Sequence, residues 1–480
     1  METLPPRRWY HRIGPGLITA CVVIGPGSIM TSSKVGANDG YAMLWIVVVS
    51  VVFMLIYMQL GAKLGAVAKA APCDLIREKA GAPLSMLVGI GVFFISAAFQ
   101  SGNNIGVAAA FEAFVESKYI VAALVVGFNG MAILFLFVFR DMYKMLERLM
   151  MGFVALMLIS FAINLIVLKP DLVAMLKGFV PSRGKSGDTL SLLGLVGTTF
   201  VITAAFYQAY LVRQKGWNVK DLKSGLVDAR VGSVIMALIT IMLMSTAAAG
   251  LYTGQKVTLA NPVAVAEALE STFGTSAKVI FCLGLFSAAY SSFLVNSMIG
   301  GFMAADGLGW GNKPTDFGPR VLTTVALLTG MVVGLAVLLL DFDRTPTIIA
   351  AQAVTVVAAP LVAGVLLWLT SSKDVMGPHA NSLPVNIFAS IGLVMLLLMA
   401  GKTAFYDLPK KVRDYVAPAQ EALESDEPAA RHGGNVSGNA REERQPGATA
   451  LHLHRAGTPA LGWHAWMLET STARAPDAAV

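Results

Sequence analysis

Charged residues are scarce in this chain. Only 14% of its 480 residues are Asp, Glu, Lys or Arg, whereas 56% are hydrophobic. Soluble domains carry about 25% charged residues, so this composition excludes an ordinary soluble domain and indicates a membrane protein. The net charge of +7 comes mostly from Lys and Arg between apolar runs, so we expect no nucleic-acid partner.

Cysteine is also rare, and no catalytic motif is present. The three cysteines (Cys21, Cys73 and Cys282) form no CxxC pair and no Cys/His spacing typical of a metal site. The chain has no Walker motif and no catalytic triad, so we expect neither primary pumping nor hydrolysis. No small-residue cleavage site follows the basic N-terminus, so the first apolar run is predicted to be a retained span. We therefore predict a protein that is not an enzyme and that uses no cofactor.

Eleven apolar stretches are long enough to cross a bilayer as helices, which takes about 20 residues. They lie near residues 14–43, 44–66, 85–113, 119–139, 149–168, 190–212, 231–252, 278–304, 321–340, 347–370 and 386–404. Lys and Arg concentrate in the loops that lie inside when the N-terminus is inside. The sequence predicts an all-α, multi-pass integral membrane protein, located in a bacterial inner membrane, with a cytoplasmic N-terminus.

The chain divides into three parts by composition. A short cytoplasmic N-terminus (1–13) precedes an eleven-helix domain (14–404), and a polar tail follows (405–480). The tail is rich in Ala, Glu, Arg, Gly and Pro without a spanning run, so we predict that it is mostly disordered. Ten helices of the domain divide into two repeats, about 14–168 and 190–370, and residues 386–404 add the eleventh.

The first span is interrupted halfway by Gly25-Pro26-Gly27-Ser28. Proline removes a backbone donor and glycine disfavours helix, so the helix is predicted to break there. Broken backbone inside a bilayer is tolerated where it lines a cavity enclosed by protein. A broken span near the midplane therefore points to the substrate site of a transporter. A simple proline kink is the alternative interpretation.

The sixth span holds a second weak point at Gly197–Ala204. Its mid-depth residues are β-branched and rich in hydroxyl groups. The sixth span opens the second half of the domain, so its position corresponds to that of the first span in an inverted repeat. The sequence therefore indicates an unwound segment here too, by a weaker local signal than the Pro-Gly pair of the first span.

Several strings in these spans resemble the Nramp family of proton-coupled divalent-metal transporters. They are GPGLI at 14–18, GYAMLW at 40–45, SAAYSS at 287–292, Gln352 and LTSSKDVMG at 369–377. The resemblance covers about residues 13–404. It implies a LeuT-type fold, with two inverted five-helix repeats, an eleventh helix, and broken helices 1 and 6. It also implies secondary active transport by alternating access.

The substrate site departs from the pattern of the family that the chain resembles. The family has Asp-Pro-Gly-Asn at the first break, where this chain has Gly25 and Ser28 at the Asp and Asn positions. The family's metal-binding positions in helix 6 correspond here to Thr198, Val201, Ile202 and Thr203, and only Gln352 of helix 10 is retained. The predicted substrate-binding residues are Gly25, Pro26, Gly27, Ser28, Thr198, Thr199, Val201, Thr203 and Gln352.

The proton route of the family is also altered. Its acidic residues in helix 3 align with Gln100 and Asn103, and an Arg of helix 9 aligns with Thr324. Asn and Gln do not titrate, whereas proton coupling needs a titratable group. We therefore predict these three residues to line a pathway or coupling region, and the coupling ion, proton or sodium, stays open.

These differences from the family pattern leave two classes of substrate open. A divalent ion such as Mn²⁺, Fe²⁺ or Mg²⁺ is the substrate that the resemblance implies, but it lacks a carboxylate or soft sulfur ligand here. Helix starts and hydroxyl donors suit a small anion such as bicarbonate better. Lys34 stands near the outer approach, either as a functional cation or as a residue that snorkels to the interface. A third hypothesis is a membrane receptor or sensor that does not transport.

Overall fold

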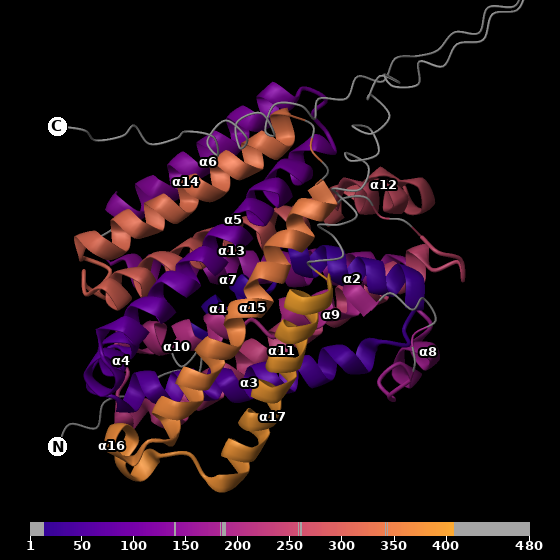
Figure 1. The fold of residues 1–480 in the computed structure, drawn as a ribbon. Helices are drawn as coiled ribbons and strands as arrows, with labels where there is room; N and C mark the ends of the chain where they lie inside the picture. The colour runs from indigo at the N-terminus through magenta and orange to yellow at the C-terminus, as the bar shows by residue number, and fades with distance from the viewer. Residues whose placement is uncertain are drawn as a thin grey trace, which may run out of the picture. The chain divides into compact units, whose positions relative to one another are not determined.

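The computed structural model describes residues 14–407 except 139–140, 183, 185–188, 258, 260–261, 341 and 343. Every regular element in the described ranges is helical, which confirms the all-α prediction (Figure 1). The predicted N-terminal segment 1–13 and nearly all of the predicted tail lie outside the described residues.

The helices follow one another along the chain with short connections. They are α1 (Pro15–Val23), α2 (Pro26–Asp39), α3 (Leu44–Val67), α4 (Pro72–Ala80), α5 (Ala82–Glu112), α6 (Lys118–Val138), α7 (Met142–Val167), α8 (Leu172–Lys177), α9 (Thr189–Thr199), α10 (Ile202–Gln214), α11 (Leu222–Leu251), α12 (Pro262–Phe273), α13 (Thr275–Leu308), α14 (Phe317–Leu339), α15 (Arg344–Ser371), α16 (Lys373–Met376) and α17 (Leu383–Lys402). Short turns of other helix types lie at Val219–Asp221, Gly377–His379 and Thr403–Asp407.

Each of the eleven predicted spans falls on a helix or on a pair of helices. Among the described residues, nine helices are long and apolar enough to cross a membrane, and the bent pair of α1 and α2 makes a tenth. The eleventh, α15, is helical over 28 residues, and its side chains are described from residue 358 onward. The chain is therefore a multi-pass integral membrane protein.

Two helices begin earlier than the apolar runs predict. The runs place the start of the fifth span at residue 149 and that of the seventh at residue 231, whereas α7 begins at Met142 and α11 at Leu222. The added turns carry polar residues such as Glu147 and Asp228, which an apolar window leaves out. Hydropathy locates the apolar part of a helix, but the hydrogen-bonded helix continues into its polar ends.

The first span breaks where the sequence predicts. Helix α1 ends at Val23 and α2 begins at Pro26, with a bend of 58° between them. Pro26 takes the first helical position of α2, where a missing N–H costs nothing, and Gly25 before it is extended. The interruption is therefore a break with a new helix start, rather than a simple kink.

The sixth span also breaks, between α9 and α10. Thr199 ends α9 and Ile202 starts α10, so Phe200 and Val201 form the break. The Phe200 ring packs against the ring of Tyr57 in α3, with centroids 5.3 Å apart. This contact fixes the unwound segment against a neighbouring span.

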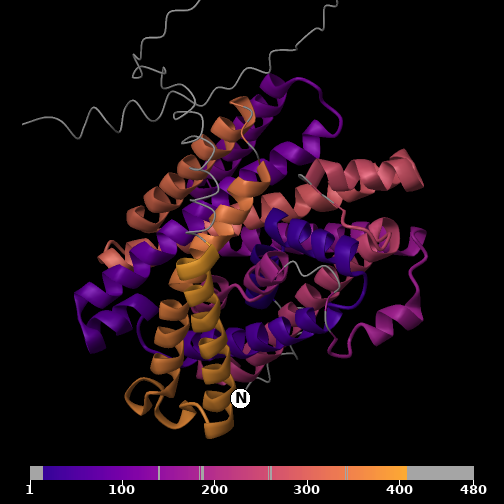
Figure 2. The same cartoon turned by 45° about the vertical axis from the view of Figure 1, so that its right-hand side comes forward.

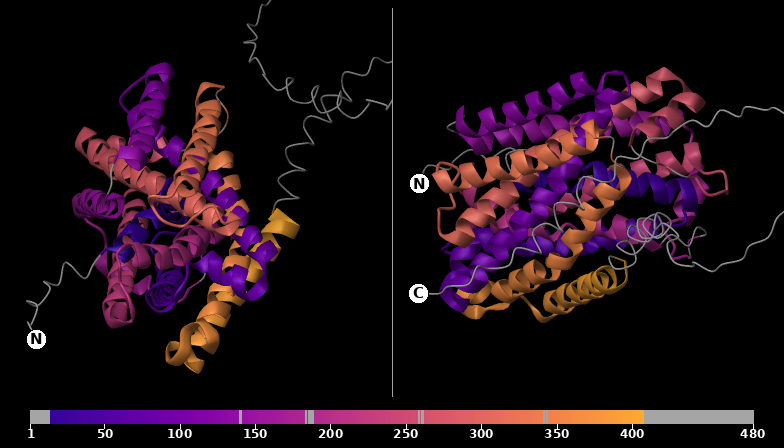
Figure 3. Two further views of the ribbon diagram at one scale, coloured as in Figure 1. Left: turned by 90° about the vertical axis from the view of Figure 1, so that its left-hand side faces the viewer. Right: turned by 45° about the horizontal axis from the view of Figure 1, so that its top comes forward.

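Helices α5 and α13 pack along each other through the middle of the described bundle, and α1 and α2 run beside them (Figures 1 and 2). Helices α6 and α14 lie side by side at the outside of the bundle, and α15 and α17 form another outer pair (Figure 3). The two breaks thus lie in the interior of the helix bundle, where side chains from several spans reach them.

Candidate functional site

The two helix breaks are joined by the hydroxyl of Ser28. Its Oγ donates to the carbonyl oxygen of Val23 (2.5 Å), at the end of α1, and lies 3.2 Å from the carbonyl oxygen of Thr198, near the end of α9. Ser28 and Thr198 are both buried. The structure therefore brings together one residue from each predicted half of the site.

A second contact between the breaks involves Thr31, which is not among the residues predicted from sequence. The hydroxyl oxygens of Thr31 and Thr198 lie 3.1 Å apart, and Thr31 Oγ1 also donates to the carbonyl oxygen of Gly27 (2.9 Å). Thr31 lies one turn after Ser28, on the same face of α2. The hydroxyl-rich string that contains Thr31 was a usable signal in the sequence.

Gly25 faces a wall formed by α5 and α13. A Cβ atom at Gly25 would lie 3.1 Å from Ser292 Oγ and 3.3 Å from Asn103 Oδ1. The Ser292 hydroxyl also donates to the carbonyl oxygen of Val22 (3.1 Å). Ser292 is thus a site residue absent from the predicted set, although it lies in the SAAYSS string that supports the family resemblance.

The first main-chain amides of two helices lie at the breaks. Gly27 and Ser28 belong to the first turn of α2, and Ile202 and Thr203 to the first turn of α10. The first amides of a helix have no partner inside that helix and carry the positive end of its dipole. The carbonyls of Val22, Val23 and Thr198 receive hydroxyl protons. Each break therefore presents the donor end of a helix.

The remaining predicted residues of the sixth span point in different directions. The Thr199 hydroxyl donates to the carbonyl oxygen of Leu195 in its own helix (2.7 Å), so it is occupied locally. Val201 and Thr203 line a small cavity, about 20 Å³ in volume, together with Ile95 and Phe99 of α5. Gln352 lies in α15, and its side chain is outside those described.

Gln100 and Asn103, which align with the acidic residues in the third span of the family, form an amide network in α5. Asn103 Nδ2 donates to Gln100 Oε1 (3.2 Å), while Gln100 Nε2 is buried without a partner. Gly330 of α14 packs against Gln100, and the Thr324 hydroxyl donates within its own helix to Arg320 (2.9 Å). Thr324 is six residues, about 9 Å along the helix, from Gly330. The structure therefore places Asn103 at the first break and Thr324 further along the helix that packs against Gln100.

Lys34 lies two turns after the first break and is half-buried in α2. One turn further, Asn38 binds the loop before α12 through both polar atoms of its amide. Asn38 Nδ2 donates to the carbonyl oxygen of Val257 (3.1 Å), and Asn38 Oδ1 accepts from the Val257 amide (2.8 Å). The end of α2 far from the break is thus hydrogen-bonded to the main chain of the loop before α12. Lys34 lies one turn closer to the break.

The start of α1 is held by acidic residues of other helices. Asp228 of α11 accepts hydrogen bonds from the amides of Gly14 (2.7 Å) and Gly16 (2.6 Å). Lys215 and Glu147 form an ion pair with an N–O distance of 2.8 Å. Both side chains lie against Gly14, because a Cβ added there would collide with them. These contacts fix α1 at the end opposite the break.

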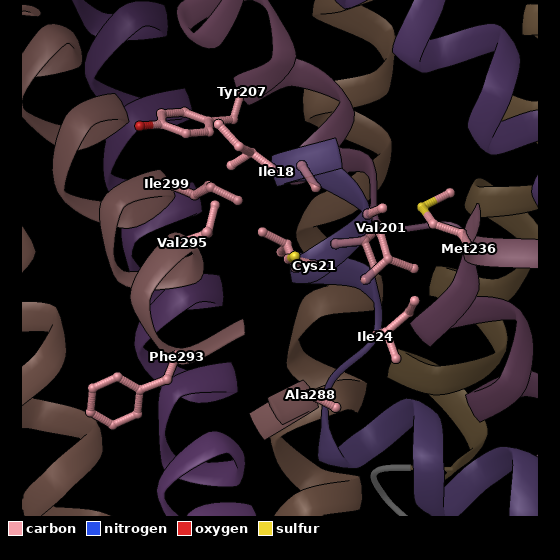
Figure 4. Close-up of a cluster of buried hydrophobic side chains, with 14 of the residues drawn as sticks. Ile18, Cys21, Ile24, Val201, Tyr207, Met236, Ala288, Phe293, Val295 and Ile299 are labelled. Atoms are coloured by element: carbon pink, nitrogen blue, oxygen red, sulfur yellow. The ribbon is translucent and has the colours of Figure 1, made fainter. Parts of the chain in front are cut away.

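Apolar side chains fill the space between the break and this end of α1. Figure 4 shows Ile18 and Cys21 of α1 between Val295 and Ile299 of α13 on one side and Val201 on the other. All five side chains are buried. The labelled side chains around this part of α1 are therefore apolar and buried.

The described residues contain no cluster of three or more His, Cys, Asp or Glu side chains that could hold a metal ion. The groups that converge on the breaks are hydroxyls, main-chain amides, main-chain carbonyls and the Asn103 amide. The described groups that converge on the breaks would thus meet an ion as neutral dipoles.

Comparison with known proteins identifies relatives over nearly the whole domain. Residues 16–405 match the family described as natural resistance-associated macrophage protein-like, Nramp. A divalent metal cation transporter MntH from Deinococcus radiodurans is 24% identical over 401 residues, covering 82% of this chain and 89% of that protein. A protein of the same name from Yersinia enterocolitica is 24% identical and covers 82% and 93%.

Solved structures show the same fold. The Eremococcus coleocola manganese transporter, in complex with an aromatic bis-isothiourea substituted compound, aligns with a TM-score of 0.70 and 20% identity, covering 83% of this chain and 88% of that one. MhsT in complex with L-phenylalanine aligns with a TM-score of 0.55 and 14% identity, covering 80% and 98%. These alignments confirm the predicted LeuT-type fold.

Proposed function

This chain belongs to the Nramp family, and from that premise we propose that it carries a small inorganic ion across a membrane by alternating access. The observation that supports the proposal most directly is the buried contact between the two helix breaks at Ser28 and Thr198. Irregular backbone inside a bilayer is costly unless it serves a cavity or a substrate. Two breaks that meet in one bundle are the arrangement that an ion site between two repeats requires.

Alternating access needs contacts that open in turn, and the protein offers a set at each end of the first span. At the Gly14 end they are the Asp228 bonds and the Lys215–Glu147 pair. At the other end they are the bonds between Asn38 and Val257. We propose that one set opens while the other stays closed.

A divalent metal cation is the substrate that the relatives support better. The two MntH proteins are named for that activity, and nothing in their names points to an anion. At this site a cation would meet the carbonyls of Val23 and Thr198 and the neighbouring hydroxyls. Such neutral oxygens suit a cation that keeps part of its water shell, as Mg²⁺ does, better than one that depends on soft ligands.

A small oxyanion such as bicarbonate is the second candidate, and one observation favours it. The amides of Gly27, Ser28 and Thr203 lie in the first turns of α2 and α10, whose amides have no partner inside their own helix, whereas the nearby carbonyls already receive hydroxyl protons. An anion would satisfy these amides and would also gain from the two helix dipoles. A bare cation at the same place would lose its hydration, and no carboxylate would compensate for the desolvation free energy.

Location, orientation and coupling complete the proposal. The excess of Lys and Arg in alternate loops supports a cytoplasmic N-terminus, and the bacterial relatives support an inner-membrane location. Neutral Gln100 and Asn103 supply no titratable group, so we propose that any proton coupling avoids these positions.

The experiment is uptake into proteoliposomes that contain the purified chain, with Mn²⁺, Mg²⁺ and bicarbonate compared at one pH. Metal uptake that other divalent ions compete with supports the cation, and bicarbonate uptake without a metal signal supports the anion. Empty liposomes, and liposomes with heat-inactivated protein, control for leakage. Uptake of none of the three ions overturns the transport proposal and favours a receptor or sensor.

A further inference from the structure

A second cavity lies at the Gly14 end of the protein, and none of its described lining residues belongs to the two breaks. It is about 460 Å³ in volume and is lined by the start of α7 and by the end of α10. Glu147 and Lys215 line it, and both side chains also lie against Gly14. One water molecule takes about 30 Å³ of liquid, so the cavity has room for a small ion together with its first shell of water.

The charges at this cavity balance. The four charged side chains among its described lining residues are Asp141, Lys144, Glu147 and Lys215. They form two ion pairs, because Lys144 Nζ lies 3.3 Å from Asp141 Oδ2 and Lys215 Nζ lies 2.8 Å from Glu147 Oε1. An ion of either sign therefore meets no excess of like charge at the described wall of the cavity.

Four polar side-chain atoms at or behind this cavity have no hydrogen-bond partner in the described part of the chain. They are the hydroxyl oxygens of Tyr143 and Tyr207 and both polar atoms of the Gln214 amide. Tyr143 and Gln214 line the cavity, although these polar atoms are buried. Tyr143 is 8% exposed and Tyr207 is 1% exposed. Buried polar atoms nearly always have a partner and lose free energy without one, so this group of four needs a physical reason.

The three side chains form a series that leads from the cavity into the bundle. Gln214 follows Tyr207 by seven residues in α10, a spacing of two turns that places both on one face of the helix. Tyr143 precedes Glu147 by one turn in α7 and lies within electrostatic range of Tyr207. Tyr207 belongs to the same buried cluster as Ile18 of α1 (Figure 4). The series therefore reaches the apolar side chains around α1, the helix that ends at the first break.

We propose that Tyr143, Gln214 and Tyr207 line the route by which the transported ion, with water around it, passes between the Gly14 end and the first break. The cavity is the open end of this route. The inference rests on the proposed function, because it names residues along a path that alternating access must open. A phenol and an amide each donate and accept hydrogen bonds, so they match the water shell of a cation and of an anion.

The Lys215–Glu147 ion pair closes the route in the described conformation. Lys215 directly follows Gln214, and Glu147 lies one turn from Tyr143, so separation of the pair moves the wall that covers the unpartnered atoms. Water that enters then supplies the hydrogen bonds that these atoms lack. The unpartnered atoms thus raise the free energy of the closed conformation relative to the open one, which makes the closure reversible.

Tyr207→Phe and Gln214→Leu remove unpartnered polar atoms and test the route. Because neither variant loses a hydrogen bond to protein, we expect the melting temperature in detergent to stay equal or to rise. We expect the initial uptake rate of Mn²⁺, Mg²⁺ or bicarbonate, whichever the native chain carries, to fall about fivefold. Tyr290→Phe is the matched control, since its hydroxyl donates to the carbonyl oxygen of Phe128 (3.3 Å). We expect this control to lower the melting temperature and to keep the native uptake rate.

Thiol labelling tests the route without transport. Gln214→Cys in the reconstituted full chain is expected to react slowly with a water-soluble methanethiosulfonate, and about fivefold faster when Lys215→Ala also breaks the ion pair. Ser50→Cys is the matched control, because Ser50 is buried in α3 and its hydroxyl donates to Ile46 in its own helix (2.8 Å). We expect the control to react slowly with and without Lys215→Ala. The three native cysteines are buried, and the native chain measures their background.

Native uptake rates in Tyr207→Phe and Gln214→Leu would overturn the proposal, as would a lower melting temperature that accompanies slower uptake in them. Labelling of Gln214→Cys that Lys215→Ala leaves unchanged would also overturn it. If the native chain carries none of the three ions, the proposed function fails, whereas the labelling still shows whether the route opens. The two failures are therefore distinguishable.

Discussion

The hydroxyl of Ser28 lies 3.2 Å from the carbonyl oxygen of Thr198, so this side chain connects the two broken helices. The same hydroxyl is 2.5 Å from the carbonyl oxygen of Val23. One O–H group thus serves the carbonyl ends of both α1 and α9. At this position a residue without a donor would remove both contacts.

Replacement of Ser28 by Ala is therefore expected to destabilise the closed site. Loss of a buried hydrogen bond, with acceptors left unsatisfied, costs about 1–2 kcal/mol. We expect the free energy of unfolding in detergent to fall by that amount, measured by denaturant titration. Ser287→Ala is the control, because Ser287 Oγ donates only to Leu283 in its own helix (2.8 Å) and such bonds add little. Equal losses in the two variants would contradict a special role for Ser28.

Replacement of Gly25 by Asp adds a carboxylate at the first break. Its Cβ would lie 3.1 Å from Ser292 Oγ and 3.3 Å from Asn103 Oδ1, so these side chains must shift by a few tenths of an ångström. We expect Mn²⁺ affinity to increase about tenfold, about 1.4 kcal/mol, and bicarbonate uptake to be lost, because the charge attracts the cation and repels the anion.

Gly25→Asn is the matched control for this change. It has nearly the same shape as the Asp variant but no charge, so the difference between the two variants measures the charge alone. Binding is measured by calorimetry and uptake in proteoliposomes. A Gly25→Asp variant with unchanged response to both ions would mean that the substrate does not approach Gly25.

The first break could be predicted from sequence because proline and glycine act locally. Pro26 cannot continue the helix of α1, and its fixed φ suits the first position of α2. The second break has no such residue. Phe200 and Val201 have no strong local preference against a helix, so the prediction depended on the β-branched, hydroxyl-rich stretch around them and on the order of the spans.

The partners of the breaks could not be predicted, because they come from helices distant in sequence. Ser292 lies 270 residues from Val22, whose carbonyl it binds, and its serine-rich string fits helix packing equally well. Asp228 escapes prediction because it lies at the polar start of α11, before the predicted apolar run. The pairing of these groups depends on tertiary packing, which no local pattern of hydrophobic residues encodes.

Replacement of Asp228 by Asn is expected to loosen the start of α1. The carboxylate accepts from Gly14 (2.7 Å) and Gly16 (2.6 Å), and hydrogen bonds to a buried charge contribute about 1.5–3 kcal/mol. We expect unfolding free energy to fall by about 2 kcal/mol and limited proteolysis near residue 14 to become faster. Asp221→Asn is the control, because its bond to the Asn218 amide is exposed and longer (3.3 Å). Equal stability of the two variants would contradict the role of Asp228.

Replacement of Lys34 by Gln tests whether the half-buried Lys34 attracts the substrate. Lys34 lies on α2 between the first break and Asn38, which binds Val257. If the transported ion is an anion, we expect the initial uptake rate to fall about threefold at low ionic strength and the difference to shrink as salt is added. For a cation the same change should raise the rate, because it removes a repulsive charge. Lys256→Gln is the control, because Lys256 is exposed in the adjoining loop. A Lys34→Gln rate equal to that of the control at every salt concentration would show that Lys34 only reaches toward the membrane interface.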